Sequence, residues 1–123
     1  MHALIVDDST TMRMVLKAQL KMLGCEATEA VNGLDALVQL RGMLEVDVVL
    51  VDWNMPEMDG LSFVRAVRAD LSFELLPLVM VTTNNDVAHV SLALEAGANE
   101  YLMKPFTIAM VREKLEMLGF LGT

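Results

Sequence analysis

Three aspartates of this 123-residue chain stand directly after short apolar runs, where charge is costly. Asp7 and Asp8 follow the run ALIV at residues 3–6, and Asp52 follows VVLV at residues 48–51. Runs of this length and composition are typical of buried β-strands. A carboxylate at the end of such a strand carries a large desolvation penalty unless it has a partner. These aspartates therefore indicate a site that needs them, or a helix cap or turn.

Two later apolar runs end in polar side chains of other types. LVMV at residues 78–81 is followed by Thr82, and EYLM at residues 100–103 is followed by Lys104. If the strands are parallel, their carboxyl ends lie along one edge of an open sheet, which is the edge where ligands bind. The predicted site therefore combines three carboxylates, one hydroxyl and one ammonium group.

Three carboxylates in one crevice require a shared proton or a bound cation. At ~4 Å and an effective dielectric constant of ~20, each pair of like charges costs on the order of 4 kcal/mol. Mg²⁺ prefers oxygen ligands and keeps water positions that phosphoryl oxygens can take. An aspartate nucleophile, Mg²⁺ and a facing lysine suit phosphoryl transfer to a carboxylate. We therefore predict Mg²⁺ as the cofactor, with Lys104 neutralising the transferred charge and Thr82 hydrogen-bonding a phosphoryl oxygen.

The rest of the chain alternates five times between strand and helix patterns. Strands are predicted at residues 3–6, 25–30, 46–51, 76–81 and 100–103, and helices at residues 9–23, 32–40, 60–71, 86–97 and 106–119. Asn32 and Thr107 are predicted helix N-caps, and Gly24 and Gly97 are predicted to end helices. The alternation favours one α/β domain over residues 1–123, in which helices cover both faces of a parallel sheet.

Apolar residues at helical spacing predict which helix faces turn inward. In the helix at 32–40 these are Leu34, Leu37 and Val38. The helix at 60–71 has the apolar series Leu61, Val64, Val67 and Leu71.

Composition excludes several classes of protein. Hydrophobic residues make up 54% of the chain, yet no run approaches the roughly 18 uninterrupted apolar residues of a membrane span. No signal peptide is visible, and the single Cys25 excludes an internal disulfide, so a cytoplasmic protein without a membrane role is expected. A net charge of −8 argues against sequence-independent binding of nucleic acid.

Five separated motifs resemble those of the response-regulator receiver domain. They are VDDS, DWNMPEMDG, VMVTT, AGANEYLMKPFT and EKLEMLG, and they occur in the family's order over nearly the whole chain. Among receivers, the chain is most similar to chemotaxis regulators. The resemblance implies a flavodoxin-like, doubly wound sheet of five parallel strands in the order 2-1-3-4-5, with five helices.

The resemblance also implies a role for each acidic residue. It makes Asp52 the phosphoacceptor and Asp8 a direct Mg²⁺ ligand. Asp7 would act beside Asp8, mostly through water. Asn54 would give its backbone carbonyl to the metal, so that the implied metal site consists of Asp7, Asp8, Asp52 and Asn54.

Signal transmission is implied to depend on two further positions. Lys104 would contact the phosphoryl group, and its bond to Pro105 would be cis. Thr82 and Tyr101 would form the switch pair, in which the hydroxyl moves toward the phosphate and the ring turns inward.

Three positions around the site are expected to tune it. Receivers usually carry a small residue after the switch threonine, whereas this chain has the β-branched Thr83. Asn84 is neutral where chemotaxis members often carry an acid. Together with Asn54 it flanks the line along which water attacks the acyl phosphate, so these residues are expected to set the lifetime of the signal.

Output is expected through binding, because no effector domain follows the last predicted helix. The candidate partner surface comprises Val87, Val90, Leu94, Tyr101, Met103, Met110, Lys114 and Met117. A face with several methionines suits docking of a partner helix; the alternative is that half of its Met and Val residues belong to the core. The implied partners are a histidine kinase as phosphodonor and an output protein such as a flagellar switch component. A monomer is expected, because Val90 and Met110 stand where dimerising transcription factors carry charges.

Other functions fit the sequence less well. Haloacid-dehalogenase-like phosphatases also use Asp, Mg²⁺ and Lys, but they need Asp-x-Asp after the first strand, whereas here Asn54 holds the second position and the motif follows the third strand. A nucleotide-binding flavodoxin-like module would need a Gly-rich loop after residues 3–6. Among regulators, the alternatives to a chemotaxis role are a phosphorelay shuttle and a receiver excised from a hybrid histidine kinase. The chain is expected to be a signalling switch rather than an enzyme with turnover.

Overall fold

The computed structural model describes residues 1–43, 45–83 and 86–121, and its elements alternate as predicted. The strands are β1 (His2–Val6), β2 (Glu26–Ala30), β3 (Val48–Asp52), β4 (Leu78–Thr82) and β5 (Glu100–Met103). The helices are α1 (Thr10–Met22), α2 (Gly33–Gly42), α3 (Gly60–Ala69), α4 (Val87–Ala96) and α5 (Ile108–Met117), with a 3-10 turn, η1 (Leu71–Phe73), after α3. Within the described ranges, no helix is both long and apolar enough to cross a membrane.

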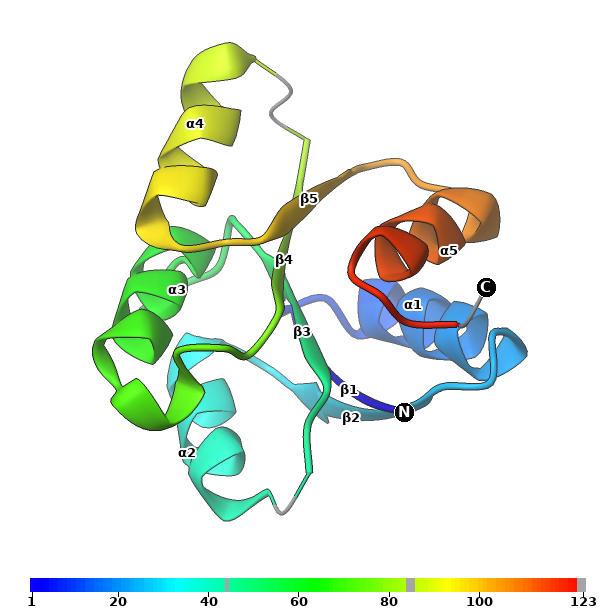
Figure 1. The fold of residues 1–123 in the computed structure, drawn as a ribbon, viewed down its shortest axis with the longest axis horizontal. Coiled ribbons are helices and arrows are strands. Elements are labelled where there is room, and N and C mark those ends of the chain that lie inside the picture. The colour runs from blue at the N-terminus through cyan, green and yellow to red at the C-terminus, as the bar shows by residue number, and fades with distance from the viewer. Residues whose placement is uncertain (44, 84–85, 122–123) are drawn as a thin grey trace.

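The five strands form one parallel sheet in the order β2-β1-β3-β4-β5, which confirms the predicted fold class. Figure 1 shows α2, α3 and α4 on one face of the sheet and α1 and α5 on the other. Since all strands run the same way, their carboxyl ends lie along one edge. The strand order reverses between β1 and β3: from β1 the chain adds β2 on one side of the sheet and then returns to add β3 on the other side of β1.

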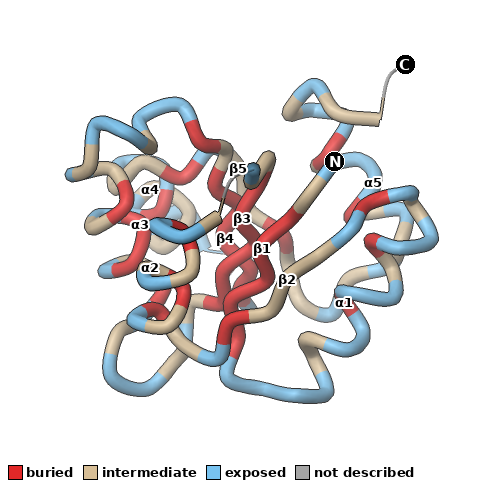
Figure 2. The backbone as a smooth tube through the Cα atoms, turned by 90° about the horizontal axis from the view of Figure 1, so that it is seen from below, coloured by how far each residue is buried: buried red, intermediate tan, exposed pale blue. Residues whose placement is uncertain are grey.

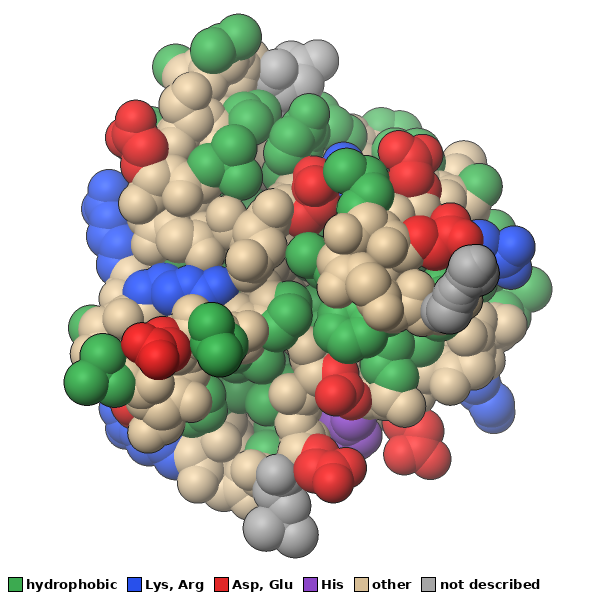
Figure 3. Space-filling view, viewed as in Figure 1, with side chains coloured by type: hydrophobic (Ala, Val, Ile, Leu, Met, Phe, Trp, Pro, Cys, Tyr) green, Lys and Arg blue, Asp and Glu red, His purple; other side chains and the backbone are tan. Residues whose placement is uncertain are grey.

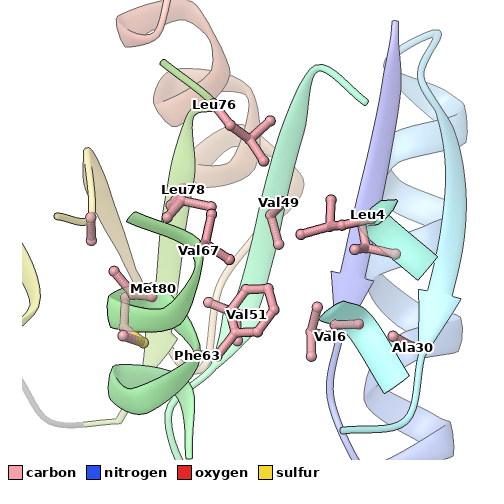
Figure 4. Packing of buried hydrophobic residues seen from close by; sticks show 14 of the residues in the cluster. Leu4, Val6, Ala30, Val49, Val51, Phe63, Val67, Leu76, Leu78 and Met80 are labelled. Carbon is pink, nitrogen blue, oxygen red and sulfur yellow. The ribbon is translucent and has the colours of Figure 1, made fainter. Parts of the chain in front are cut away.

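The core consists of two apolar layers, one on each face of the sheet. In β1, Leu4 and Val6 pack into the layer under α2 and α3, whereas Ala3 and Ile5 pack into the layer under α1 and α5. Figure 2 shows the central strands as the most buried part of the backbone, and Figure 4 shows Phe63 of α3 between the side chains of the first layer. Each fully buried side chain of this kind contributes roughly 1.5–3 kcal/mol. Because the central strands are buried on both faces, their ends, which carry the site residues, are held in fixed positions.

Side-chain caps fix where each helix begins. As predicted, Asn32 and Thr107 are N-caps, and each accepts a hydrogen bond from a backbone N–H in the first turn of its helix. Ser9 caps α1 in the same way, through the backbone N–H of Met12. Because Ser9 satisfies this helix end, the two aspartates that precede it are left for another role.

The inward faces of two helices differ only in part from the predictions, because Leu37, Leu61, Val64 and Val67 do pack into or against the core. In α2 the buried residues are Gly33, Ala36 and Leu40, whereas Leu34 and Val38 are 48% and 68% exposed. At the start of the inward face the space is narrow: a Cβ at Gly33 would lie 2.9 Å from the Met58 side chain, which would have to move.

The helix predicted to reach Leu71 ends earlier. Asp70 has an extended backbone, and its side chain accepts the N–H of Ser72. This starts a separate 3-10 turn, so Leu71 points away from the core and is 78% exposed.

Candidate functional site

The carboxylates of Asp7, Asp8 and Asp52 lie together at the carboxyl edge of the sheet. Val6 of β1 is paired with Val51 of β3, so the next residue on each strand is an aspartate at the same level. One carboxylate oxygen of each of the three lies within 4.8 Å of the others. Asp7 and Asp52 are buried, whereas Asp8 is exposed. The structure therefore brings the three predicted carboxylates together.

Lys104 reaches this cluster from the end of β5. Its backbone N–H donates to the carbonyl of Thr82 on the neighbouring strand (2.8 Å), and its bond to Pro105 is cis. Its Nζ lies 2.9 Å from Oδ1 of Asp52 and 3.5 Å from Oδ2 of Asp7. A long side chain is needed here, because β4 separates β5 from β3.

The charges in this site are only partly balanced. Burial raises the pKa of Asp52, and the negative charges of Asp7 and Asp8 raise it further, although the hydrogen bond from Lys104 acts in the opposite direction. Burial alone lowers the pKa of Lys104, but the hydrogen bond to Asp52 and the charges of Asp52 and Asp7 outweigh it, so this pKa is raised. One ammonium group thus faces three carboxylates. The excess negative charge and the all-oxygen donor set are suited to a hard divalent cation.

Asp7 is held by two contacts that the sequence analysis did not identify. Its Oδ1 accepts the backbone N–H of Ser9 (2.8 Å), and its carbonyl accepts Nη1 of Arg13 (2.7 Å). The side chain of Arg13 is only 11% exposed and also pairs with Glu29 of β2. The sequence contained one sign of the Arg13 contact, because Arg13 lies about one turn into the helix that follows Asp7 and Asp8 and can therefore reach back to them.

Gly60 allows the chain after β3 to fold back on the end of that strand. Its N–H donates to the carbonyl of Trp53 (2.8 Å). A Cβ at this position would lie 2.4 Å from the carbonyl oxygen of Asp52 and 2.9 Å from Cα of Trp53. Both close atoms belong to the backbone, so moving them aside would cost considerable free energy.

Replacing Gly60 with Ala is therefore expected to destabilise the protein by about 1–3 kcal/mol, the usual cost of overpacking. Gly42→Ala is the matched control, because a Cβ there meets nothing within 4 Å. At that helical position the change is expected to be neutral or stabilising by up to about 1 kcal/mol. Urea unfolding of the two variants and the wild type gives the comparison. Equal midpoints for the two variants would contradict the close approach at Gly60.

The remaining predicted site residues differ in their burial. Thr82 ends β4 and is buried, whereas Thr83 and Asn54 are exposed. Tyr101 is half-buried and packs against the first core layer. Nζ of Lys114 lies 4.6 Å from the centre of the Tyr101 ring. Asn84 lies outside the described residues.

The predicted partner surface is solvent-accessible throughout. Val87, Leu94 and Met117 are 81%, 46% and 59% exposed, and the other five residues are partly exposed. A hollow of about 230 Å³ is lined by Tyr101, Met103, Met110, Glu113 and Lys114. Figure 3 shows hydrophobic side chains gathered between α4 and α5 on this face. None of the eight is fully buried, although Tyr101 and Met110 also pack against the core layers.

Comparisons with known proteins agree with this geometry. A family model described as the response regulator receiver domain matches residues 3–116. Chemotaxis protein CheY1 of Helicobacter pylori (strain J99) is 47% identical over 124 residues, covering 100% of this chain and 98% of its own length. The chemotaxis protein CheY homolog of Campylobacter jejuni (serotype O:23/36) is also 47% identical, covering 100% and 94%.

A solved structure of a chemotaxis response regulator, CheY4 of Vibrio cholerae, superimposes with a TM-score of 0.89 at 32% identity, covering 95% of this chain and 97% of that one. The family model, the full-length relatives and the fold all point to a receiver domain. The chain belongs to the response regulator receiver domain family and is a signalling switch rather than a turnover enzyme.

Proposed function

We propose that this protein is a chemotaxis response regulator that accepts a phosphoryl group on Asp52 from a phosphohistidine of a histidine kinase. The observation that carries the proposal is the cluster of three carboxylates within 4.8 Å, with Nζ of Lys104 at 2.9 Å from Asp52. The full-length similarity to chemotaxis proteins supports the biological setting. The same similarity supports a cytoplasmic location as part of the proposal.

The proposed reaction makes Asp52 the nucleophile. An Oδ of Asp52 forms a bond to phosphorus while the P–N bond to the donor imidazole breaks, and the electron pair of that bond stays on the imidazole nitrogen. Lys104 neutralises charge on the phosphoryl oxygens, and Thr82 hydrogen-bonds one of them. Asp7 is less suited to attack, because Oδ1 accepts the backbone N–H of Ser9 and Oδ2 accepts a hydrogen bond from Nζ of Lys104 at 3.5 Å, so both of its oxygens are engaged.

Mg²⁺ is the proposed cofactor, held by the carboxylates of Asp7, Asp8 and Asp52 and by the backbone carbonyl of Asn54. When bound, it supplies positive charge that offsets the excess carboxylate charge and that of the phosphoryl group. The donor set fits this ion, because every contributing side-chain atom is a carboxylate oxygen.

We infer that output passes through Thr82 and Tyr101 to the partner surface defined above. The hollow on this surface is lined by Tyr101, Met103 and Met110 together with the charged Glu113 and Lys114. Lys114 also pairs with Glu100 at 2.9 Å. These features suit an amphipathic partner helix, such as a segment of a flagellar switch component. A phosphorelay role would instead require a histidine phosphotransfer domain as the partner.

The direct test is phosphorylation by a small acyl phosphate with Mg²⁺, followed by intact mass measurement and peptide mapping. We expect about one hydroxylamine-labile phosphoryl group per chain, located on Asp52, and none when EDTA replaces Mg²⁺. A wild-type protein that stays unlabelled, or is labelled elsewhere, would refute the proposed function. Binding of flagellar switch peptides against phosphotransfer domains then separates the two regulatory roles.

Thr83 provides a further prediction about access to the site. It follows the buried Thr82 and is exposed, so its β-branched side chain stands at the surface beside the site. Thr83→Ala is expected to speed labelling by small donors while leaving Mg²⁺ affinity nearly unchanged, because Thr83 is not a proposed ligand. Parallel phosphorylation time courses check this. Equal or slower labelling of the variant would show that Thr83 does not restrict entry.

A further inference from the structure

Trp53, the residue directly after Asp52, contacts the first turn of α4 through His89. The ring centroids lie 5.3 Å apart and the ring planes meet at 67°, an edge-to-face arrangement. Aromatic rings favour this geometry because the positive edge of one meets the negative face of the other. The contact joins the end of β3 to the helix that follows β4.

The His89 ring is oriented by the N-cap of its own helix. Asp86 caps α4 by accepting the backbone N–H of His89 at 2.8 Å, and both carboxylate oxygens lie 2.8 Å from Nδ1 of the ring. An ionised carboxylate only accepts hydrogen bonds, so Nδ1 carries a proton. The backbone N–H of His89, followed by its side chain, lowers the pKa of Asp86. Carboxylate, imidazole and indole thus form a continuous chain of contacts.

Trp53 is fixed close to Asp52 at the other end of this chain. Its backbone N–H donates to the carbonyl of Val81 (3.0 Å), and its backbone carbonyl accepts a hydrogen bond from the N–H of Gly60 (2.8 Å). Its half-buried indole also packs against the first core layer. The indole is therefore tied to the backbone that directly follows Asp52.

The helix that receives this contact is held by little buried surface. In α4 only Ala93 is buried, whereas α3 buries Gly60, Phe63, Val64 and Val67. A helix with so few buried side chains shifts at low cost, so a single specific contact affects its position. The side chain of His89 is itself 40% exposed, which means that general burial does not hold it in place.

We propose that His89 is a positioning residue that couples the state of the Asp52 site to the first turn of α4 by holding the indole of Trp53. This inference rests on the proposed function of Asp52 and adds the route by which α4 senses it. The route does not pass through Tyr101, and it ends on the helix that carries Val87, Val90 and Leu94 of the partner surface.

Hydrogen exchange measured by mass spectrometry tests this coupling. The full chain is compared without ligand and with Mg²⁺ plus fluoroberyllate, a stable mimic of a phosphoryl group on Asp. We expect fluoroberyllate to change the exchange rates of α4 amides in the wild type. In His89→Ala that change should fall by about threefold or more, within the range set by loss of an aromatic pair. His89→Phe keeps a ring edge for Trp53 and should restore it.

Two readouts separate coupling from general damage. Trp53 is the only tryptophan of the chain and directly follows Asp52, so its fluorescence is expected to respond to Mg²⁺ and to give the Mg²⁺ affinity. His89→Ala should change that affinity by less than about twofold, because His89 is not one of the proposed Mg²⁺ ligands. Leu92→Ala, on the same helix and 40% exposed, is the matched control and should keep the wild-type exchange response.

The inference is overturned if α4 shows no exchange response in the wild type, if His89→Ala keeps the full response, or if His89→Phe fails to restore it. Failure of the proposed function is a different result, because it appears as wild-type protein that acquires no phosphoryl group on Asp52.

Discussion

Replacing Asp52 with Asn is expected to abolish phosphorylation, from about one phosphoryl group per chain to background. The amide has nearly the shape of the carboxylate but lacks the anionic oxygen that attacks phosphorus. Lys104 and the other two carboxylates remain, so charge and metal ligands persist around an inert side chain. Intact mass measurement after incubation with an acyl phosphate and Mg²⁺ gives the answer.

Asp59→Asn serves as the control for this experiment. Asp59 is an exposed carboxylate in the loop between β3 and α3, and it caps α3 by accepting the backbone N–H of Ser62. Asparagine is an equally good N-cap, so this variant should fold and label normally. Full labelling of Asp52→Asn would move the phosphoacceptor to another residue, with Asp7 and Asp8 as the first to examine.

The same variant has an expected effect on stability that depends on pH. The pKa of Asp52 is raised in the folded protein, and this net direction already includes the opposing hydrogen bond from Lys104. As pH rises from the ordinary Asp value through the raised value, the unfolded chain loses its proton first, so the unfolding free energy falls. Metal-free Asp52→Asn should therefore melt above the wild type at pH 7 and lose most of that advantage near pH 3. A constant difference across this range would contradict the unfavourable charge at Asp52.

Mg²⁺ is expected to raise the melting temperature of the wild type strongly. A ligand at about 100 times its dissociation constant that binds only the native state contributes about 2.7 kcal/mol. For a domain of this size, this corresponds to a shift of about 10 °C. The physical source is relief of the repulsion among Asp7, Asp8 and Asp52. Thermal unfolding in EDTA and in increasing Mg²⁺ measures it.

Asp8→Ala should remove most of this stabilisation and weaken Mg²⁺ binding by at least about 10-fold, since changes even outside the ligand shell of a metal cost that much. The side chain is exposed, so its loss should cost the metal-free fold little. Glu57→Gln changes another exposed acid in the loop after β3, outside the cluster, and should keep the wild-type response. An unchanged melting temperature of the wild type at saturating Mg²⁺ would count against a metal site here.

Much of this protein is determined by local sequence. The strands follow from short continuous apolar runs, and the helices follow from an apolar period of about 3.6 residues. The caps at Asn32 and Thr107 follow from side chains that satisfy the nearest backbone N–H groups. The convergence of Asp7, Asp8 and Asp52 was predictable from one further step, because parallel strands place their carboxyl ends on one edge. The residues alone predicted a parallel sheet, whereas the strand order came from the family resemblance.

Only the tertiary structure decided which of two apolar faces turns inward. In α2, Leu34 and Val38 have the right spacing, but the face that is buried is that of Gly33, Ala36 and Leu40, where Met58 lies close to Gly33. Periodicity identifies the residues that share a face, and it contains no information about the distance to the next layer.

Contacts between residues far apart in the chain were equally beyond the sequence. The need of Gly60 to lack a Cβ depends on the backbone oxygen of Asp52, which would lie 2.4 Å from that Cβ. The edge contact of His89 with Trp53 joins the first turn of α4 to the residue that follows β3. Such contacts depend on strand order and on the separation of layers, which arise only when the whole core packs and are encoded in no single segment.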